Sequence, residues 1–335
     1  MKLDFEQIKS IVTGAVQFTQ EDDGIHLKRY TPEQEELYEN RVTHHLYCKT
    51  LNSTGMKLQF KTNARRILLQ LLIRSAGVGG LIPCSVDIFV NGELYGYLDN
   101  FPAEETDPLN DKLEKEILLE DGEKEIYVQF PYRVMTVIQG VEIDDWAYVQ
   151  PARPEKKLLV FGDSISMGCT VERPSNHYSC RLARALGAEE FNKAMGTERF
   201  FPMLAKAKDD FEPDYITVAY GTNDWDFLLR EQFLKNCPKF LNNLREVYPN
   251  AKIFVITPLW RKDRDEERLS GTFDEIVAYI RETAEKIPNT VVIDGYNLVP
   301  HEERYFIDLR LHPNDAGFEH YTRNLLAQIL PHCQG

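Results

Sequence analysis

The second half of the sequence contains residues of the types that serine-based acyl chemistry requires. They are Ser164, Gly196, Asn223 and His312. A serine hydroxyl becomes an effective nucleophile when an imidazole within hydrogen-bond reach accepts its proton during attack on an acyl carbon. Negative charge then develops on the acyl oxygen, where backbone N–H groups and an amide can bind it. This chemistry needs no metal ion or cofactor, and we predict neither.

Each of these residues also has a purely structural explanation. Ser164 could cap a helix, Asn223 is a residue type common in turns, and His312 could lie on the surface. The tripeptide Gly162-Asp163-Ser164 is weak evidence alone, because a chain of this length contains it by chance about one time in ten. The occurrence of all the residues at the ends of predicted strands or just before a predicted helix favours the catalytic interpretation.

Strands and helices alternate in this half of the chain. Short apolar or β-branched runs predict strands at 158–161, 215–219, 252–257 and 290–294, and a strand with a weaker pattern is expected near 190–192. Apolar residues at helical spacing predict helices within 273–287 and 318–329. A further helix has Ser175 as its candidate N-cap and Gly187 as its candidate left-handed C-terminal residue. This order predicts a flavodoxin-like, three-layer α/β/α domain with a parallel sheet, in which ligands bind beyond the carboxyl ends of the strands.

The segments that carry these residues resemble the GDSL, or SGNH, hydrolase family. They are Gly162-Asp163-Ser164, Asn192 to Gly196, Gly221 to Asp224 and His312-Pro313-Asn314. The family contributes Ser, Gly, Asn and His in that chain order, and the resemblance covers roughly residues 157–331. It implies that Ser164 is the nucleophile and His312 the general base, and that Ser164, Gly196 and Asn223 form the oxyanion hole. The sequence lacks G-x-S-x-G at this serine, so an ordinary α/β-hydrolase fits less well.

The third member of the catalytic set is less clear from the sequence. The family's last block is usually Asp-x-x-His, but here Leu309 stands three residues before His312 and Asp308 stands four before it. Either a local bulge brings Asp308 to the imidazole, or a backbone carbonyl orients the imidazole and a Ser-His dyad operates. We predict Asp308. Replacement by Asn distinguishes the two, because a triad then loses activity by orders of magnitude.

Three further residues are candidates for substrate binding. Trp225 follows Asp224, and Trp260 with Arg261 lies just past the predicted strand 252–257. Aromatic faces stack on sugars, and an arginine can bind a polar acyl or hydroxyl group. The alternative is that the tryptophans pack in the core and that Arg261 is a charge on the rim.

The first half of the chain has the pattern of a β domain. Apolar or alternating runs predict strands at 66–74, 85–90, 124–130 and 134–143. Asn91-Gly92 suits a type I′ turn, which predicts a hairpin over 86–98. We therefore predict a β-sandwich, jelly-roll-like domain at 1–150, a linker at 150–154, and the hydrolase domain at 151–335.

Composition excludes several classes of protein. The net charge of −14 repels phosphate backbones and anionic lipid surfaces, so we expect no nucleic-acid or membrane partner. The apolar runs are far shorter than the roughly 20 residues of a membrane span, and the N-terminal sequence predicts no signal peptide, so we expect a cytoplasmic protein. Six cysteines without a CxxC pair favour neither a disulfide framework nor a zinc site. The oligomeric state stays open.

These patterns predict a serine esterase that removes small O-acyl groups, expected to be acetyl, from a carbohydrate ester. The preference for a sugar rests on the β domain, because a jelly-roll-like module before the hydrolase domain resembles carbohydrate esterases of family two. One alternative is a lipase-like or thioester hydrolase, or an acyltransferase, that uses the same site. Another is a glycan-binding protein with an inactive hydrolase domain.

Overall fold

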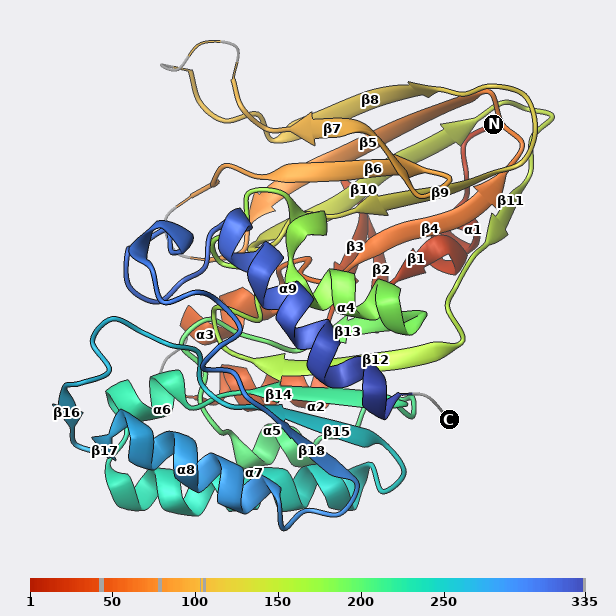
Figure 1. Ribbon diagram of the computed structural model, residues 1–335. Coiled ribbons are helices and arrows are strands. Elements are labelled where there is room, and N and C mark those ends of the chain that lie inside the picture. The colour runs from red at the N-terminus through yellow and green to blue at the C-terminus, as the bar shows by residue number, and fades with distance from the viewer. Residues whose placement is uncertain (42–44, 78–79, 103, 105–106, 334–335) are drawn as a thin grey trace. The chain divides into compact units, whose positions relative to one another are not determined.

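A computed structural model describes residues 1–41, 45–77, 80–102, 104 and 107–333. The chain divides into two compact units (Figure 1). The first unit contains Met1–Pro154 and Glu172–Ser175, and the second contains Glu155–Val171 and Asn176–Gly335. The boundary lies after Pro154 and not after Gln150, because β11 (Val149–Pro151) pairs with β4 (Lys57–Thr62) in a sheet of the first unit. The predicted linker therefore begins as a strand.

The first unit contains two antiparallel sheets, as the sequence predicted. One has the order β1-β4-β9-β6-β7, and the other has the order β2-β3-β10-β5-β8. Besides β4 and β11, which pairs with β4 off this path, the strands of the first sheet are β1 (Val12–Thr13), β9 (Lys124–Gln129), β6 (Ser85–Val90) and β7 (Glu93–Asp99). The second sheet consists of β2 (Gln17–Glu21), β3 (Gly24–Lys28), β10 (Val134–Ile143), β5 (Arg66–Ser75) and β8 (Lys112–Leu118). Three helices accompany them, α1 (Phe5–Ile11), α2 (Pro32–Glu39) and α3 (His45–Thr50).

Alternation of side chains explains how these two sheets form one sandwich. Successive residues of a strand point to opposite faces, so every second residue reaches the core. Along β5 the buried residues at this spacing are Ile67, Leu69, Leu71 and Ile73. They share one apolar cluster with Val86 and Ile88 of β6 and Ile126 and Val128 of β9. The predicted hairpin is confirmed as well, since Asn91 and Gly92 have φ values of 52° and 82°.

The second unit is built on a five-stranded sheet in which all neighbouring strands are parallel. Its order is β13 (Ala188–Asn192), β12 (Lys156–Gly162), β14 (Tyr215–Ala219), β15 (Lys252–Ile256) and β18 (Thr290–Ile293). This is the flavodoxin-like order 2-1-3-4-5, which confirms the predicted fold class. The direction of the strand order reverses between β12 and β14, and ligands bind at such a point in open α/β sheets.

Helices cover both faces of this sheet (Figure 1). On one face α4 (Tyr178–Leu186) and α9 (Asp315–Ile329) share an apolar cluster with Leu158 and Val160 of β12. Phe161 points to the other face, where its ring contacts Phe240 of α7 (Arg230–Val247). That face also carries α5 (Pro202–Lys206) and α8 (Phe273–Ala284). The remaining elements are α6 (Thr222–Phe227), β16 (Glu267–Arg268), β17 (Gly271–Thr272), η1 (Pro174–Asn176), η2 (Glu303–Tyr305) and η3 (Leu330–His332).

One predicted helix start is wrong. Ser175 does not cap α4, because residues 174–176 form a short 3₁₀ turn and the α-helix begins at Tyr178. The N-cap is His177, whose imidazole accepts the N–H of Ser179. The Ser175 N–H instead donates to the carboxylate of Asp87 at 2.9 Å. The predicted end of the helix is confirmed, since Gly187 is left-handed with φ of 59°.

No helix among the described residues is both long and apolar enough to cross a membrane.

Candidate active site

The nucleophile candidate lies on the turn that leaves β12. Gly162 is the last residue of that strand and pairs in register with Ala219 of β14. A side chain at Gly162 would collide with Ser166, because a Cβ atom there would lie 2.2 Å from the Ser166 Oγ. Only glycine lets the chain turn back so closely after the strand. This tight turn places Ser164 at the carboxyl edge of the sheet, beside the point where the strand order reverses.

Ser164 and His312 form a hydrogen bond across the second unit. The Ser164 Oγ and the His312 Nε2 lie 2.8 Å apart, although 148 positions separate the two residues in the chain. His312 precedes α9, and about a quarter of its side chain is exposed. The imidazole is therefore within reach of the serine proton and open enough to exchange protons with a substrate or water.

Asp308 contacts the other ring nitrogen of His312, Nδ1. Its Oδ2 lies 2.7 Å from the His312 Nδ1. Its Oδ1 accepts three backbone N–H groups, from Arg310, Leu311 and His312, at 2.8–3.0 Å. Burial alone would raise the pKa of Asp308, but the Leu311 N–H and the imidazole and N–H of His312 outweigh it and lower the pKa to about 2. An ionised Asp308 holds the proton on Nδ1, which leaves Nε2 free to accept one from serine.

The extra residue in this block is accommodated at Leu309. Its φ is 55°, a left-handed backbone conformation that residues other than Gly, Asn and Asp seldom adopt. The resulting turn folds the chain back so that Asp308 accepts the N–H groups that follow it. The spacing Asp-x-x-x-His thus brings the carboxylate to the imidazole. Of the two alternatives that the sequence left open, the structure contains the local bulge that brings Asp308 to the imidazole.

Gly196 lies on the loop after β13, and Asn223 lies in the first turn of α6. The Gly196 N–H donates to the Met167 Sδ at 3.3 Å, and a thioether is a weak acceptor that an oxyanion can replace. Asn223 is buried, and its Nδ2 donates to the Glu198 carbonyl oxygen at 3.1 Å. An amide nitrogen has two protons, so this bond orients the Asn223 amide and leaves its second proton as a donor. Sequence reasoning missed Met167 and Glu198, and no pattern in the sequence marks either one.

Asp224 connects the two segments that carry Gly196 and Asn223. Its Oδ2 accepts the Gly221 N–H at 3.1 Å, and its Oδ1 accepts the Phe200 N–H at 3.2 Å. The carboxyl group is fully buried, and burial raises its pKa to about 7. This side chain therefore connects the start of α6, where Asn223 lies, to the segment that follows Gly196.

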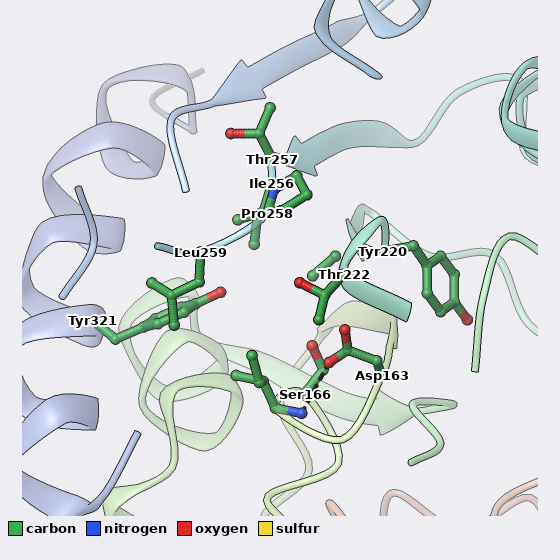
Figure 2. Close-up of a pocket in the computed structure, with 11 residues that line it drawn as sticks. Asp163, Ser166, Tyr220, Thr222, Ile256, Thr257, Pro258, Leu259 and Tyr321 are labelled. Atoms are coloured by element: carbon green, nitrogen blue, oxygen red, sulfur yellow. Dashed lines mark hydrogen bonds between the residues drawn. The ribbon is translucent and has the colours of Figure 1, made fainter. Parts of the chain in front are cut away.

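A water-sized pocket adjoins the nucleophile turn but does not include the nucleophile. Its volume is about 20 Å³, which is room for about one water molecule. Figure 2 shows Asp163, Ser166, Thr222 and Tyr321 among the residues that line it. Asp163 accepts the Ile165 N–H at 2.9 Å, and burial raises its pKa to about 6. The pocket lies between the nucleophile turn and the segments that follow β14 and β15, and it is too small to hold a substrate.

Residues 160–320 match the model of the GDSL-like Lipase/Acylhydrolase family. They form a GDSL-like lipase/acylhydrolase domain. The matched segment begins within β12 and ends within α9, so it contains Ser164, His312 and the loops between them. No curated protein sequence matches the chain.

Several solved structures share the fold over nearly the whole chain. A salicylyl-acyltransferase from a tetracycline biosynthetic pathway is 19% identical, with a TM-score of 0.82 over 96% of this chain and 94% of that one. A putative GDSL-like lipase from Bacteroides ovatus is 18% identical, with a TM-score of 0.73 over 99% and 98% of the two chains. A family two carbohydrate esterase from Clostridium thermocellum, solved in complex with cellohexaose, is 13% identical, with a TM-score of 0.64 over 96% and 98%.

The prediction that Trp225 and Arg261 contact substrate is wrong, because both side chains are buried in the interior of the GDSL-like domain. Trp225 is fully buried, and its indole N–H donates to the Gly271 carbonyl oxygen at 2.9 Å. Arg261 is fully buried as well and forms ion pairs with Asp226 and Asp263 at 3.0 and 2.6 Å. Neither side chain reaches a surface that a substrate can contact. The short helix α6 turns the Trp225 ring inward, where it packs under the Arg261 guanidinium.

Trp260 occupies a different environment in the same domain. It is half-buried, and its ring is parallel to that of His301, with 5.3 Å between the ring centres. Phe306 contacts it at the same centre-to-centre distance. An aromatic cluster of this kind keeps the indole in one orientation and leaves part of the ring exposed.

Proposed function

We propose that the protein is a serine esterase that removes small O-acyl groups, expected to be acetyl, from a carbohydrate. The observation that carries the proposal is the continuous hydrogen-bonded series from Ser164 through His312 to Asp308. The GDSL-like acylhydrolase domain supports the same class of reaction. In this proposal Ser164 is the nucleophile, His312 the general base and Asp308 the residue that orients the imidazole.

The reaction follows from these positions in two steps. The Ser164 Oγ attacks the ester carbonyl carbon while the His312 Nε2 takes the hydroxyl proton. The oxyanion accepts hydrogen bonds from the Ser164 and Gly196 N–H groups and from the Asn223 amide. Imidazolium returns the proton to the sugar oxygen, and the C–O bond breaks to leave an acyl-serine. Water, deprotonated by the same imidazole, then releases the carboxylic acid and restores the serine.

Two features support a carbohydrate as the alcohol part of the ester. The two-unit fold is similar to that of a family two carbohydrate esterase solved with cellohexaose. Trp260 lies in the loop after β15, at the same edge of the sheet as the proposed nucleophile. Its half-exposed ring is kept in one orientation by stacking on His301. Aromatic faces of this kind stack on the apolar faces of sugar rings.

A second candidate is acyl transfer to, or hydrolysis of, a more apolar substrate. Large apolar side chains are exposed at the end of α6 and in loops of this domain, with exposed fractions of 60% for Phe227, 81% for Leu269 and 54% for Ile307. Apolar contacts of this kind favour a longer acyl chain or an aromatic group. The fold similarity to a salicylyl-acyltransferase points in the same direction.

One experiment separates the candidates. Purified protein is incubated with acetylated xylan, acetylated mannan, simple acetyl sugars and p-nitrophenyl esters of increasing chain length, with Ser164→Ala as the control. The proposal predicts release of acetate from at least one sugar ester and preference for acetyl over longer chains. Preference for long chains, or transfer of the acyl group to an added alcohol, supports the second candidate. Sugar binding by calorimetry with no turnover would show a binding protein and contradict the proposal.

A further inference from the structure

Three arginine side chains converge on one carboxylate oxygen in the loop after β15. The Oδ2 of Asp263 accepts hydrogen bonds from Arg261 at 2.8 Å, Arg310 at 3.0 Å and Arg268 at 3.2 Å. Its Oδ1 accepts a second bond from Arg261 at 2.6 Å. Burial alone would raise the pKa of Asp263, but the hydrogen bond and charge of Arg261 and the charge of Arg310 outweigh it and lower the pKa. Asp263 and these arginines therefore form an ion network around one ionised carboxylate.

One end of the ion network is fixed to α6, the helix that carries Asn223. Arg261 is fully buried, and its Nη1 and Nη2 donate to the two carboxylate oxygens of Asp226 at 3.0 and 3.1 Å. Its Nη1 also donates to the Thr222 carbonyl oxygen, in the first turn of the same helix, at 3.4 Å. An arginine paired with a carboxylate through two parallel bonds has a specific geometry. Asp263 is therefore held at a set position relative to the helix of Asn223.

The other end of the ion network is the triad turn, residues 308–312, which carries Asp308 and His312. Arg310 lies between these two residues, and its Nη1 donates to Asp263. The carbonyl oxygen of Arg310 accepts the Lys262 N–H at 3.1 Å. One side-chain bond and one backbone bond therefore attach the triad turn to the loop after β15.

The part of the triad turn beside Asp308 is exposed. The side chain of Leu309 is more than half exposed, and its backbone is left-handed. Leu311 is buried in the apolar cluster below α9, so packing fixes the turn on that side. The N–H groups that donate to Asp308 come from the turn itself, so these bonds maintain its shape and do not attach it to a neighbouring segment. The two bonds of Arg310 make that attachment.

We propose that the ion pair between Asp263 and Arg310 positions the triad turn against the amide of Asn223. The proposal rests on the proposed function, because it concerns the spacing between the general base and an oxyanion donor. Both members of the pair act through the turn and not on the reacting atoms, so they are positioning residues. A displacement of about 1 Å in such a site lowers the rate by about 100-fold.

Variants of the two partners test this role by kinetics with p-nitrophenyl acetate. In Arg310→Gln the ion pair is lost, and kcat should fall about tenfold or more with KM little changed, because ground-state contacts remain. Asp263→Ala should also lower kcat, and the double variant should lose no more than Asp263→Ala alone, since both changes remove one interaction. Losses that multiply in the double variant, or a higher KM with unchanged kcat in Arg310→Gln, would contradict the proposal.

Arg268 provides a matched control for the charge around Asp263. Its side chain donates to the same Oδ2 as that of Arg310, and the exposed fractions of the two side chains are 32% and 44%. Arg268 belongs to β16, however, and not to the triad turn. Arg268→Gln should therefore leave kcat close to that of wild type. A loss equal to that in Arg310→Gln would assign the effect to charge alone and overturn the proposal.

Hydrogen–deuterium exchange tests the attachment of the triad turn without any assay of activity. Bonds to Asp308 protect the N–H groups of Arg310, Leu311 and His312 while the turn keeps its structure. After correction for intrinsic rates, the peptide that contains these residues should exchange faster in Arg310→Gln than in wild type. Its exchange should be unchanged in Arg268→Gln. Equal exchange in all three proteins would overturn the proposal.

Failure of this proposal can be told from failure of the proposed function. If wild-type protein hydrolyses no ester, the esterase proposal fails, but exchange still shows whether Arg310 holds the triad turn. If wild-type protein is active and folded Arg310→Gln retains wild-type kcat, the positioning role fails and the esterase proposal stands. If Asp263→Ala does not fold, the comparison of Arg310→Gln with Arg268→Gln still decides the kinetic test.

Discussion

Asp308 lies four residues before His312, and its Oδ2 is 2.7 Å from the His312 Nδ1. The left-handed Leu309 makes this spacing possible, because it turns the chain so that the carboxylate also accepts the N–H groups of Arg310, Leu311 and His312. Four hydrogen bonds converge on one carboxylate. This arrangement favours a Ser-His-Asp triad over a Ser-His dyad for the proposed reaction.

Replacing the carboxylate tests that triad. In Asp308→Asn the amide can still accept backbone N–H groups, but it stabilises the wrong tautomer of His312, with the proton on Nε2. We expect kcat for p-nitrophenyl acetate to fall by about 10⁴-fold, as in serine proteases, with a similar melting temperature. Asp265→Asn is the control, because that side chain is almost fully exposed. A loss of less than tenfold in Asp308→Asn would indicate a dyad.

Substitutions at Leu309 test the turn that delivers Asp308. Leu309→Gly should keep kcat near the wild-type value, because glycine adopts positive φ freely and the exposed leucine side chain contributes little packing. Leu309→Val should lower kcat, since a β-branched residue disfavours φ of 55° and the turn must rearrange. Both are measured with p-nitrophenyl acetate. Equal activity in the two variants would show that the left-handed conformation is unimportant.

The amide of Asn223 is expected to act mainly on the transition state. Asn223→Ala should lower kcat about 100-fold, the usual effect of removing one oxyanion donor, and should change KM little. Asn242→Ala provides the comparison, because Asn242 is an exposed residue of α7 whose amide donates to the Pro238 carbonyl oxygen of the same helix. Steady-state kinetics of both variants measure kcat and KM separately. A higher KM with unchanged kcat in Asn223→Ala would assign the amide to substrate binding instead.

Arg261 should matter for stability. Its removal takes the buried cation from Asp226 and Asp263, which keep only the partly exposed Arg268 and Arg310 as ion-pair partners. Breaking a buried ion pair costs about 3–5 kcal/mol, and we expect a loss near the lower end of this range. Denaturant unfolding of Arg261→Ala measures this free energy. Lys262→Ala breaks the neighbouring exposed pair with Glu303 and should cost about 1 kcal/mol or less. If Arg261→Ala unfolds like wild type and raises only KM, Arg261 binds substrate after all.

The order of elements in the second unit could be predicted because buried parallel strands appear as short apolar runs. The strand predicted at 215–219 agrees with β14, and the order of serine, glycine, asparagine and histidine along the chain located the candidate site. The strand at 190–192 was weaker in the sequence, because β13 contains two adjacent glutamates. Glu190 is nevertheless fully buried, where the hydrogen bonds of Ser179 and Asn192 compensate for burial.

Other features depend on contacts that no local pattern records. The spacing of Asp308 and His312 suggested a bulge, but leucine rarely adopts positive φ, so the residue type at 309 gives no sign of the left-handed turn that forms it. Trp225 follows a strand end, as a cleft residue would, but only the packing of α6 shows that its ring points inward. The cap of α4 was misplaced for a similar reason, since Ser175 is the better N-cap residue type and His177 is the one whose contacts suit the position.

The covalent intermediate gives the most direct test of the proposed reaction. The protein is mixed with p-nitrophenyl acetate, quenched in acid within the first turnovers, digested and analysed by mass spectrometry. We expect one acetyl group on the peptide that contains Ser164, and neither the acetylated peptide nor turnover in a correctly folded Ser164→Ala variant. Wild-type turnover in Ser164→Ala, or an acetyl group that forms at catalytic rate only on another residue, would contradict the proposal.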